Sequence, residues 1–307
     1  MAAEPVAAPG PVGDDTRAGL VYALAAYALW GMLPLYMKAL AHVPAYEVVL
    51  HRAIWSVPVA GILLLLLRRT ADIRAALRSP RTLAMAAVTA GLISVNWGIY
   101  VWAISVDRAT ETALGYYINP LVNVLLAALF LGERLGRLQW VSVALATMAV
   151  LILTMEAGHL PWISLVLALT FGIYGFLRKT LPIGPSQGFF LEVIILAIPA
   201  TAVAVWLGVA GTGHFRFSQG ATLWLLVGCG PATALPLILY AYGTKALRYT
   251  TIGLLFYITP TMIFLIALLV FDEPFNVVKG LAFVLIWVAL AIYTWAMFAE
   301  KGRPARE

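Results

Sequence analysis

The chain of 307 residues is 63% hydrophobic and 11% charged, with a mean hydropathy of +0.93 and a net charge of +6. Soluble domains carry about 25% charged residues, so a water-soluble fold could not hide this much apolar surface. The composition therefore predicts an integral membrane protein of several spans. Its single cysteine, Cys229, excludes an intramolecular disulfide, and its four histidines lack the spacing of a metal site.

Apolar runs between charged or Gly/Pro breaks predict ten transmembrane helices, since a span needs roughly 20 apolar residues. No alternating ten-residue pattern recurs, which favours an all-α protein over a barrel. Residues 1–17 and 299–307 are expected to be cytoplasmic tails, the first disordered and without the basic start of a signal peptide. The expected spans are 18–39, 46–67, 82–104, 111–131, 138–155, 161–179, 187–209, 221–243, 250–270 and 277–298.

The distribution of basic residues predicts the orientation, because cytoplasmic loops are enriched in Lys and Arg. With both termini in the cytoplasm, most of the 20 basic residues fall inside, including those of the 68–81 loop. Only Lys38, Arg108, Arg216 and Lys279 fall outside, and Arg52 lies within a span. The positive charge therefore reports orientation in a cell inner membrane and contact with lipid, and it does not support binding to nucleic acid.

Two halves of the chain repeat each other. Residues 115–135 and 255–275 share seven identities without a gap, among them Tyr117/Tyr257, Pro120/Pro260 and Glu133/Glu273. At an offset of 141 the match continues through Gly31/Gly172, Lys38/Lys179 and Pro58/Pro199, and one single-residue gap joins the two registers. We therefore expect a first repeat over 18–156 and a second over 157–298.

A repeat of five helices has a topological consequence. Because five is odd, the second copy must enter the membrane inverted relative to the first, as in many transporters. If the two copies exchange conformations, an outward-open molecule becomes inward-open. The substrate site is then expected near the midplane, where the copies meet.

Several prolines lie inside the expected spans, where each removes a backbone hydrogen bond. Prolines are common in membrane helices, so Pro34 and Pro236 support a functional and a neutral interpretation equally. For the positions matched between repeats we expect bends that shape the cavity. The expected helix-bending residues are Pro34, Pro58, Pro120, Pro199 and Pro260.

Polar and aromatic side chains recur on one face of eight spans, and the fifth and tenth spans lack such a stripe. Such groups face protein or water in a membrane. They could line a cavity or simply hydrogen-bond neighbouring helices, each bond giving about 0.6 kcal/mol. The stripes include His51 with Glu47 and Trp55, Asn96 with Trp97 and Tyr100, Asn119 with Thr112, Tyr116 and Asn123, and also Tyr174, Tyr240 and Tyr257.

Two ionisable residues inside spans are candidates for function. Arg52 could extend to the headgroups, pair with Glu47, or bind an anionic part of the substrate. Glu192, which matches His51 in the repeat, could carry a coupling proton or pair with Arg178 or Lys179. Glu133 and Glu273 are expected to be terminal anchors or loop caps.

The runs WGMLPLYMKAL, EVVLHRAIWS, NWGIYVWAI, ATETALGYYINPLVNVLLAALFLGERL and FGIYGFLRK resemble RarD proteins of the EamA-type branch of the drug/metabolite transporter superfamily. The resemblance covers about residues 18–298. It implies ten helices in two inverted repeats, with the fifth and tenth at the rear, where they can support a homodimer. It also implies a central cavity that includes Trp30, Tyr36, Asn96, Trp97, Tyr100, Tyr116, Tyr117, Asn119, Tyr174, Tyr240 and Tyr257.

The second repeat departs from this pattern, with Thr259 in place of Asn119 and Asp272 in place of Gly132. The two halves of the cavity are therefore expected to differ chemically. The leading hypothesis is a secondary transporter that exports a small organic metabolite or drug by alternating access, without a cofactor. The alternatives are an importer or exchanger with the same fold, a scaffold, or an intramembrane enzyme, for which we find no catalytic constellation.

Overall fold

The computed structural model describes residues 16–66, 71–131, 136–180, 183–247 and 255–301. The helices in this part of the chain are α1 (Arg17–Ala39), α2 (Ala45–Leu66), α3 (Ala71–Leu77), α4 (Pro80–Ser105), α5 (Ala109–Leu131), α6 (Arg137–Ala157), α7 (Trp162–Thr180), α8 (Pro185–Val209), the 3-10 helix η1 (Phe217–Gln219), α9 (Gly220–Ala246), α11 (Ile258–Leu269) and α12 (Val277–Lys301). Most of the expected tails, and Glu133 and Thr250, lie outside the described residues.

Eight of the described helices are long and apolar enough to cross a membrane, and α7 and α11 contribute shorter apolar segments. The expected spans correspond to α1, α2, α4 to α9, α11 and α12 within a few residues, except that α11 begins at Ile258 rather than near residue 250. The last helix continues to Lys301, so the expected tail from 299 begins later than predicted.

The loop at 68–81 contains a short helix that the hydropathy pattern did not predict. In α3, Ile73 and Ala76 are buried while Arg74 is exposed, so the helix packs its apolar side on the bundle. Ser79 is the N-cap of α4, and its hydroxyl accepts the N–H of Thr82 at 3.3 Å. A new helix therefore begins after α3.

The ninth expected span, 250–270, is interrupted. A turn at Phe256 and Tyr257 precedes α11, and Pro260 lies in the first turn of this helix rather than in the interior of a continuous span. Because Pro260 has no N–H, the carbonyl of Phe256 accepts instead from the Thr259 N–H at 3.2 Å. The ninth span is therefore broken by a turn beside Pro260 rather than being one continuous helix, whereas Pro34, Pro58, Pro120 and Pro199 lie inside helices.

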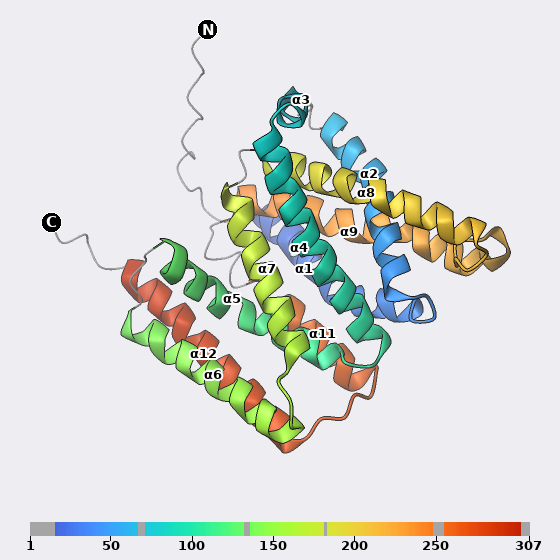
Figure 1. Ribbon diagram of the computed structural model, residues 1–307. Coiled ribbons are helices and arrows are strands. Elements are labelled where there is room, and N and C mark those ends of the chain that lie inside the picture. The colour runs from blue at the N-terminus through green and yellow to red at the C-terminus, as the bar shows by residue number, and fades with distance from the viewer. Residues whose placement is uncertain (1–15, 67–70, 132–135, 181–182, 248–254, 302–307) are drawn as a thin grey trace, which may run out of the picture.

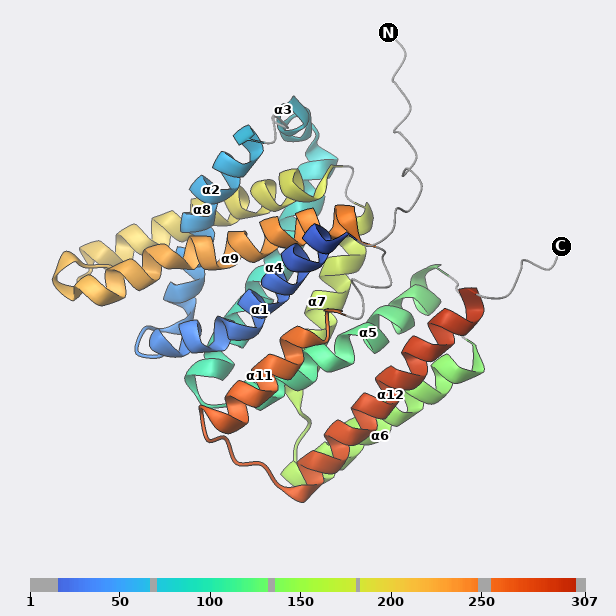
Figure 2. The ribbon, with the colours of Figure 1, turned by 180° about the vertical axis from the view of Figure 1, so that it is seen from behind.

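The helices form a bundle with α6 and α12 packed together at one edge (Figure 1). Seen from behind, α8 and α9 extend to the opposite edge (Figure 2), and both pack against α2. The connections lie at two ends. We call one the pocket end, with residues 40–44, 106–108, 158–161, 210–219 and 270–276, and the other the α3 end.

The strongest contacts between the two halves are preserved when the first five spans are exchanged with the last five. The contact of α1 with α9 becomes that of α7 with α4, and α5 with α7 becomes α11 with α1. The contact of α2 with α9 likewise becomes that of α8 with α4. Three further pairs, α2 with α8, α5 with α11 and α6 with α12, map onto themselves.

Glycines make two of these exchanged contacts close. A Cβ placed on Gly31 of α1 would lie 2.7 Å from the Cβ of Met262 on α11. A Cβ placed on Gly172 of α7 would lie 2.9 Å from Cγ1 of Val122 on α5. Gly31 and Gly172 are repeat partners, and so are the regions around Met262 and Val122.

Candidate functional site

Arg52 is the centre of the candidate site. It lies on α2, about 10 Å from the start of that helix at 1.5 Å per residue, and it is only 3% exposed. Its Nε donates a hydrogen bond to Oγ1 of Thr233 on α9 at 3.2 Å. Its guanidinium carbon lies 4.4 Å from the ring centroid of Trp97 on α4, a cation–π contact.

The charge of Arg52 has no anionic partner among the described residues. Arg52 does not extend to the headgroups, because its side chain does not reach the surface of the protein. It does not pair with Glu47 either, because Glu47 binds His214. Nη1 of Arg52 is buried and lacks a hydrogen-bond partner within the described chain. The hydroxyl of Tyr100 is in the same situation.

Tyrosines from α4 and α5 surround this guanidinium. Tyr100 and Tyr116 both interact electrostatically with Arg52, and their rings are 6.1 Å apart. Phe171 of α7 meets the Tyr116 ring edge-on, also at 6.1 Å. Tyr36 of α1 interacts with Cys229, which in turn faces Arg52, and the Tyr36 hydroxyl donates to the Leu225 carbonyl. The structure thus brings together five of the expected residues, namely Tyr36, Arg52, Trp97, Tyr100 and Tyr116.

The two expected asparagines join helices. Nδ2 of Asn96 donates to the Leu167 carbonyl at 3.1 Å and to Oγ1 of Thr170 at 2.8 Å. Nδ2 of Asn119 donates to the Ala168 carbonyl at 3.1 Å. Both amides therefore bind the backbone of α7. For these two residues the polar stripe hydrogen-bonds a neighbouring helix.

Four other expected aromatic residues lie in different surroundings. Tyr117 packs its ring on Phe283 and Trp287 of α12 and shares a 2.7 Å hydrogen bond with Thr261. Its repeat partner Tyr257 interacts with α12 as well, through Thr294 and Tyr293. The tilted rings of Trp30 and Tyr240 lie 5.7 Å apart in a cluster with Tyr27.

A polar contact closes the pocket end near Arg52, and we call it the Glu47–His214 clasp. Glu47, at the start of α2, is 2% exposed and accepts both the backbone N–H and Nδ1 of His214 at 2.7 and 2.8 Å. His51 stacks on the next residue of that loop, Phe215, at 4.8 Å. His51 also accepts a hydrogen bond from the indole of Trp55 at 3.2 Å.

A second polar contact closes the α3 end, and we call it the Arg178–Glu192 clasp. Glu192 on α8 is 1% exposed, and its Oε1 lies 2.8 Å from Nη1 of Arg178 at the end of α7. The Tyr174 hydroxyl donates to the other carboxylate oxygen at 3.1 Å. The guanidinium of Arg178 also lies over the Tyr174 ring.

Glu273 is a helix cap, as expected from the repeat. Its carboxylate accepts the backbone N–H groups of Ala109 and Thr110, the latter at 2.8 Å, and the Thr110 hydroxyl at 2.5 Å. It thereby ties the connection between α11 and α12 to the first turn of α5. Burial raises the pKa of the Glu273 carboxyl above its ordinary value, and these hydrogen bonds oppose that shift.

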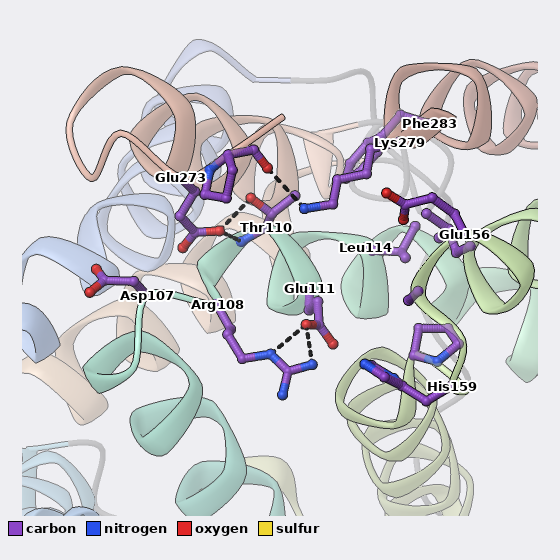
Figure 3. Close-up of a pocket in the computed structure, with 14 residues that line it drawn as sticks. Asp107, Arg108, Thr110, Glu111, Leu114, Glu156, His159, Glu273, Lys279 and Phe283 are labelled. Atoms are coloured by element: carbon purple, nitrogen blue, oxygen red, sulfur yellow. Dashed lines mark hydrogen bonds and ion pairs between the residues drawn. The ribbon is translucent and has the colours of Figure 1, made fainter. Parts of the chain in front are cut away.

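A pocket lies beside this cap (Figure 3). Arg108 pairs with Glu111 at 2.5 Å on its floor, and Nζ of Lys279 donates to the Pro274 carbonyl at 2.8 Å. Two other charged residues of the pocket also have partners, since Asp107 pairs with Lys38 and Glu156 accepts from Asn276. None of the residues described around Arg52 lines this pocket. Sequence patterns gave no signal for it.

Sequence reasoning also missed the two loop residues that complete the pocket-end clasp. His214 and Phe215 follow α8 in an irregular connection, and no periodicity predicts which helix such a loop will meet. Within the described residues, no three His, Cys, Asp or Glu side chains gather closely enough to hold a metal ion.

Comparison with known proteins places this arrangement in a family. Residues 17–155 match the EamA-like transporter family. The chain is 41% identical to Protein RarD of Streptomyces exfoliatus over 92% of this chain and 90% of that one, and 38% identical to Protein RarD of Escherichia coli (strain K12) over 95% and 99%. A solved crystal structure shares the fold, with a TM-score of 0.60 and 19% identity over 95% of this chain and 100% of that one. The chain is a multi-pass, all-helical membrane transporter and not an enzyme, and it belongs to the RarD proteins of the EamA-like transporter family.

Proposed function

We propose that the protein is a secondary transporter that exports a small organic metabolite or drug by alternating access between two inverted repeats, 18–156 and 157–298. The observation that carries this proposal is the exchange of helix contacts between the two halves. Two similar halves of five spans can swap conformations, and the swap moves the opening from one side of the membrane to the other.

The two clasps support this mechanism because they lie at opposite ends of the bundle. Both use the second helix of a repeat: α2 supplies Glu47 at the pocket end, and α8 supplies Glu192 at the α3 end. Arg52 lies between them and is buried. In this proposal the arrangement with both clasps formed is a closed state, and breaking one clasp opens one side.

The positive-inside rule assigns the α3 end to the cytoplasm. Arg17, Arg74, Arg78, Arg81 and Arg137 lie at that end, whereas the pocket end has Lys38, Arg108, Arg216 and Lys279. The first turn of α1 and the last turn of α12, the darkest blue and red of the ribbon, lie on one side of the molecule (Figure 2). Both termini are thus proposed to be cytoplasmic, in an inner membrane.

The edge pair of α6 and α12 remains the proposed surface for a homodimer. Its outward residues are large and apolar, with Trp140 57%, Met155 84% and Trp295 73% exposed. Acyl chains can cover such a surface as well. A dimer is therefore tested by the mass of the protein in nanodiscs.

Transport is tested by reconstituting the purified protein in liposomes and following counterflow of labelled organic acids, amines and neutral drugs. We expect accumulation of at least one class, abolished when both clasps are locked by cysteine pairs at 47/214 and 178/192 in a chain with Cys229 replaced. No counterflow of any class, from vesicles in which the protein is folded, would contradict the proposal. Accumulation from outside only, against the expected direction, would show an importer.

A further inference from the structure

We propose that Arg52 binds a carboxylate of the transported substrate, so that the protein takes organic monoanions with a flat apolar part. This inference deepens the proposed function and rests on it. It starts from the buried, uncompensated charge of Arg52, since a charge held away from water is costly unless it is paired.

Two carboxylates could be expected to pair with Arg52, one near it in the chain and one at the equivalent region of the second repeat, but neither is available to it. Glu47, five residues earlier on α2, is held by His214, and Glu192 is held by Arg178 and Tyr174. Among the described residues Arg52 forms no ion pair. The missing negative charge therefore has to come from outside the described chain, and a substrate supplies it.

Two buried donors at this position are available for the oxygens of a carboxylate. Nη1 of Arg52 and the hydroxyl of Tyr100 are both buried and both lack an acceptor in the described chain. Tyr100 is also near enough to Arg52 for the two to interact electrostatically. A carboxylate carries two acceptor oxygens in one plane, so one can accept from the guanidinium and the other from the phenol.

The other contacts of Arg52 fix its position and leave Nη1 without a partner in the described chain. Nε is bound to Thr233, whose own hydroxyl donates to the Cys229 carbonyl at 2.8 Å. One face of the guanidinium lies over Trp97. The group is thus oriented in advance, which lowers the cost of binding.

The charge balance and the neighbouring rings define the class of ligand. One guanidinium balances one negative charge, which favours a carboxylate over a dianionic phosphate. Trp97, Tyr116 and Phe171 offer ring surface beside the charge, which suits a flat apolar group. A cation or a neutral amide would leave Arg52 unpaired.

The test measures binding separately from transport. The probes are 3-phenylpropionate, 3-phenylpropanol and 3-phenylpropylamine, with sodium chloride as the inorganic anion, each added to the purified protein in nanodiscs. Binding only to the folded form raises the unfolding temperature. We expect a dose-dependent shift with the carboxylate alone, a loss of at least tenfold in affinity in Arg52→Met, and a threefold to tenfold loss in Tyr100→Phe.

The matched control is Arg74→Met, which removes an exposed arginine of α3 and should leave the affinity unchanged. Arg52→Met without ligand should unfold no lower than the wild type, because it removes an unpaired buried charge, whereas a purely structural arginine predicts a lower value. Equal shifts with the alcohol or with chloride, the same affinity in Arg52→Met, or no shift with the carboxylate would overturn the inference.

The two proposals fail in different ways. If binding depends on Arg52 but vesicles show no counterflow, the proposed transport function is contradicted and the carboxylate site at Arg52 is supported. Counterflow of amines or neutral drugs that Arg52→Met does not alter contradicts the carboxylate site and leaves transport.

Discussion

Gly31 on α1 and Gly172 on α7 are equivalent residues of the two halves, and each faces a side chain on the equivalent helix of the opposite half. Gly31 meets Met262 on α11, and Gly172 meets Val122 on α5. The repeat seen in the sequence is therefore also a repeat of helix crossings. Because each crossing joins one half to the other, these glycines lie where the halves would move against each other.

The crossing of α7 with α5 should not tolerate a methyl group. In Gly172→Ala the new Cβ would lie 2.9 Å from Val122, so the helices must separate, and such overpacking costs about 1–3 kcal/mol. Gly175→Ala is the matched control, three residues along α7, where a Cβ would meet nothing within 4 Å. Thermal unfolding and counterflow should both fall in Gly172→Ala only. Equal behaviour of the two variants would show that the crossing is loosely packed.

The cap at Glu273 should stabilise the pocket end. Glu273→Gln removes the charge that accepts the Ala109 and Thr110 N–H groups, and lost hydrogen bonds to a charged group cost about 1.5–3 kcal/mol. Asp272→Asn is the control, since it removes the same charge at the adjacent exposed residue. We expect a lower unfolding temperature for Glu273→Gln alone. A similar fall in both variants would indicate a general charge effect.

The pH-gradient dependence of transport should involve Glu192. This carboxylate is buried inside α8 and pairs with Arg178, and carboxylates inside membrane spans often mark proton pathways in transporters. In Glu192→Gln, flux in vesicles should respond less to an imposed pH gradient than in the wild type. Glu156→Gln, on exposed α6, is the control and should respond normally. An unchanged response in Glu192→Gln would leave Glu192 as a structural partner of Arg178.

Hydropathy and the repeat together predicted most of the fold. The span boundaries follow from apolar length. The edge position of α6 and α12 was implied by the family resemblance, and their lack of polar stripes fits it. Pro260 was assigned a bend in a continuous helix, because its sequence match with Pro120 suggested identical local structure. The turn at Phe256 and Tyr257 shows that equivalent prolines need not have equivalent backbones.

The candidate site was predicted in part. A polar stripe shows which face avoids lipid, but it cannot show whether a side chain reaches a partner helix or a ligand. Asn119 binds a partner helix, whereas the Tyr100 hydroxyl has no partner among the described residues, although both belong to the same kind of pattern. Arg52 lacks an anionic partner among the described residues because Glu47 and Glu192 pair with other residues, which come from distant segments.

Labelling of Cys229 tests the central claim most directly, namely that the two clasps give alternate access to one buried site. Cys229 is the single cysteine of the chain, is buried, and lies next to Tyr36 and Arg52. The measurement is its reaction with a membrane-impermeant methanethiosulfonate added to either side of oriented vesicles, with Cys229→Ser as the background. Glu47→Gln should raise labelling from the pocket end by about fivefold or more and lower it from the α3 end, and Glu192→Gln should do the reverse. Labelling that rises from the same side in both variants, or from both sides together, would contradict the account.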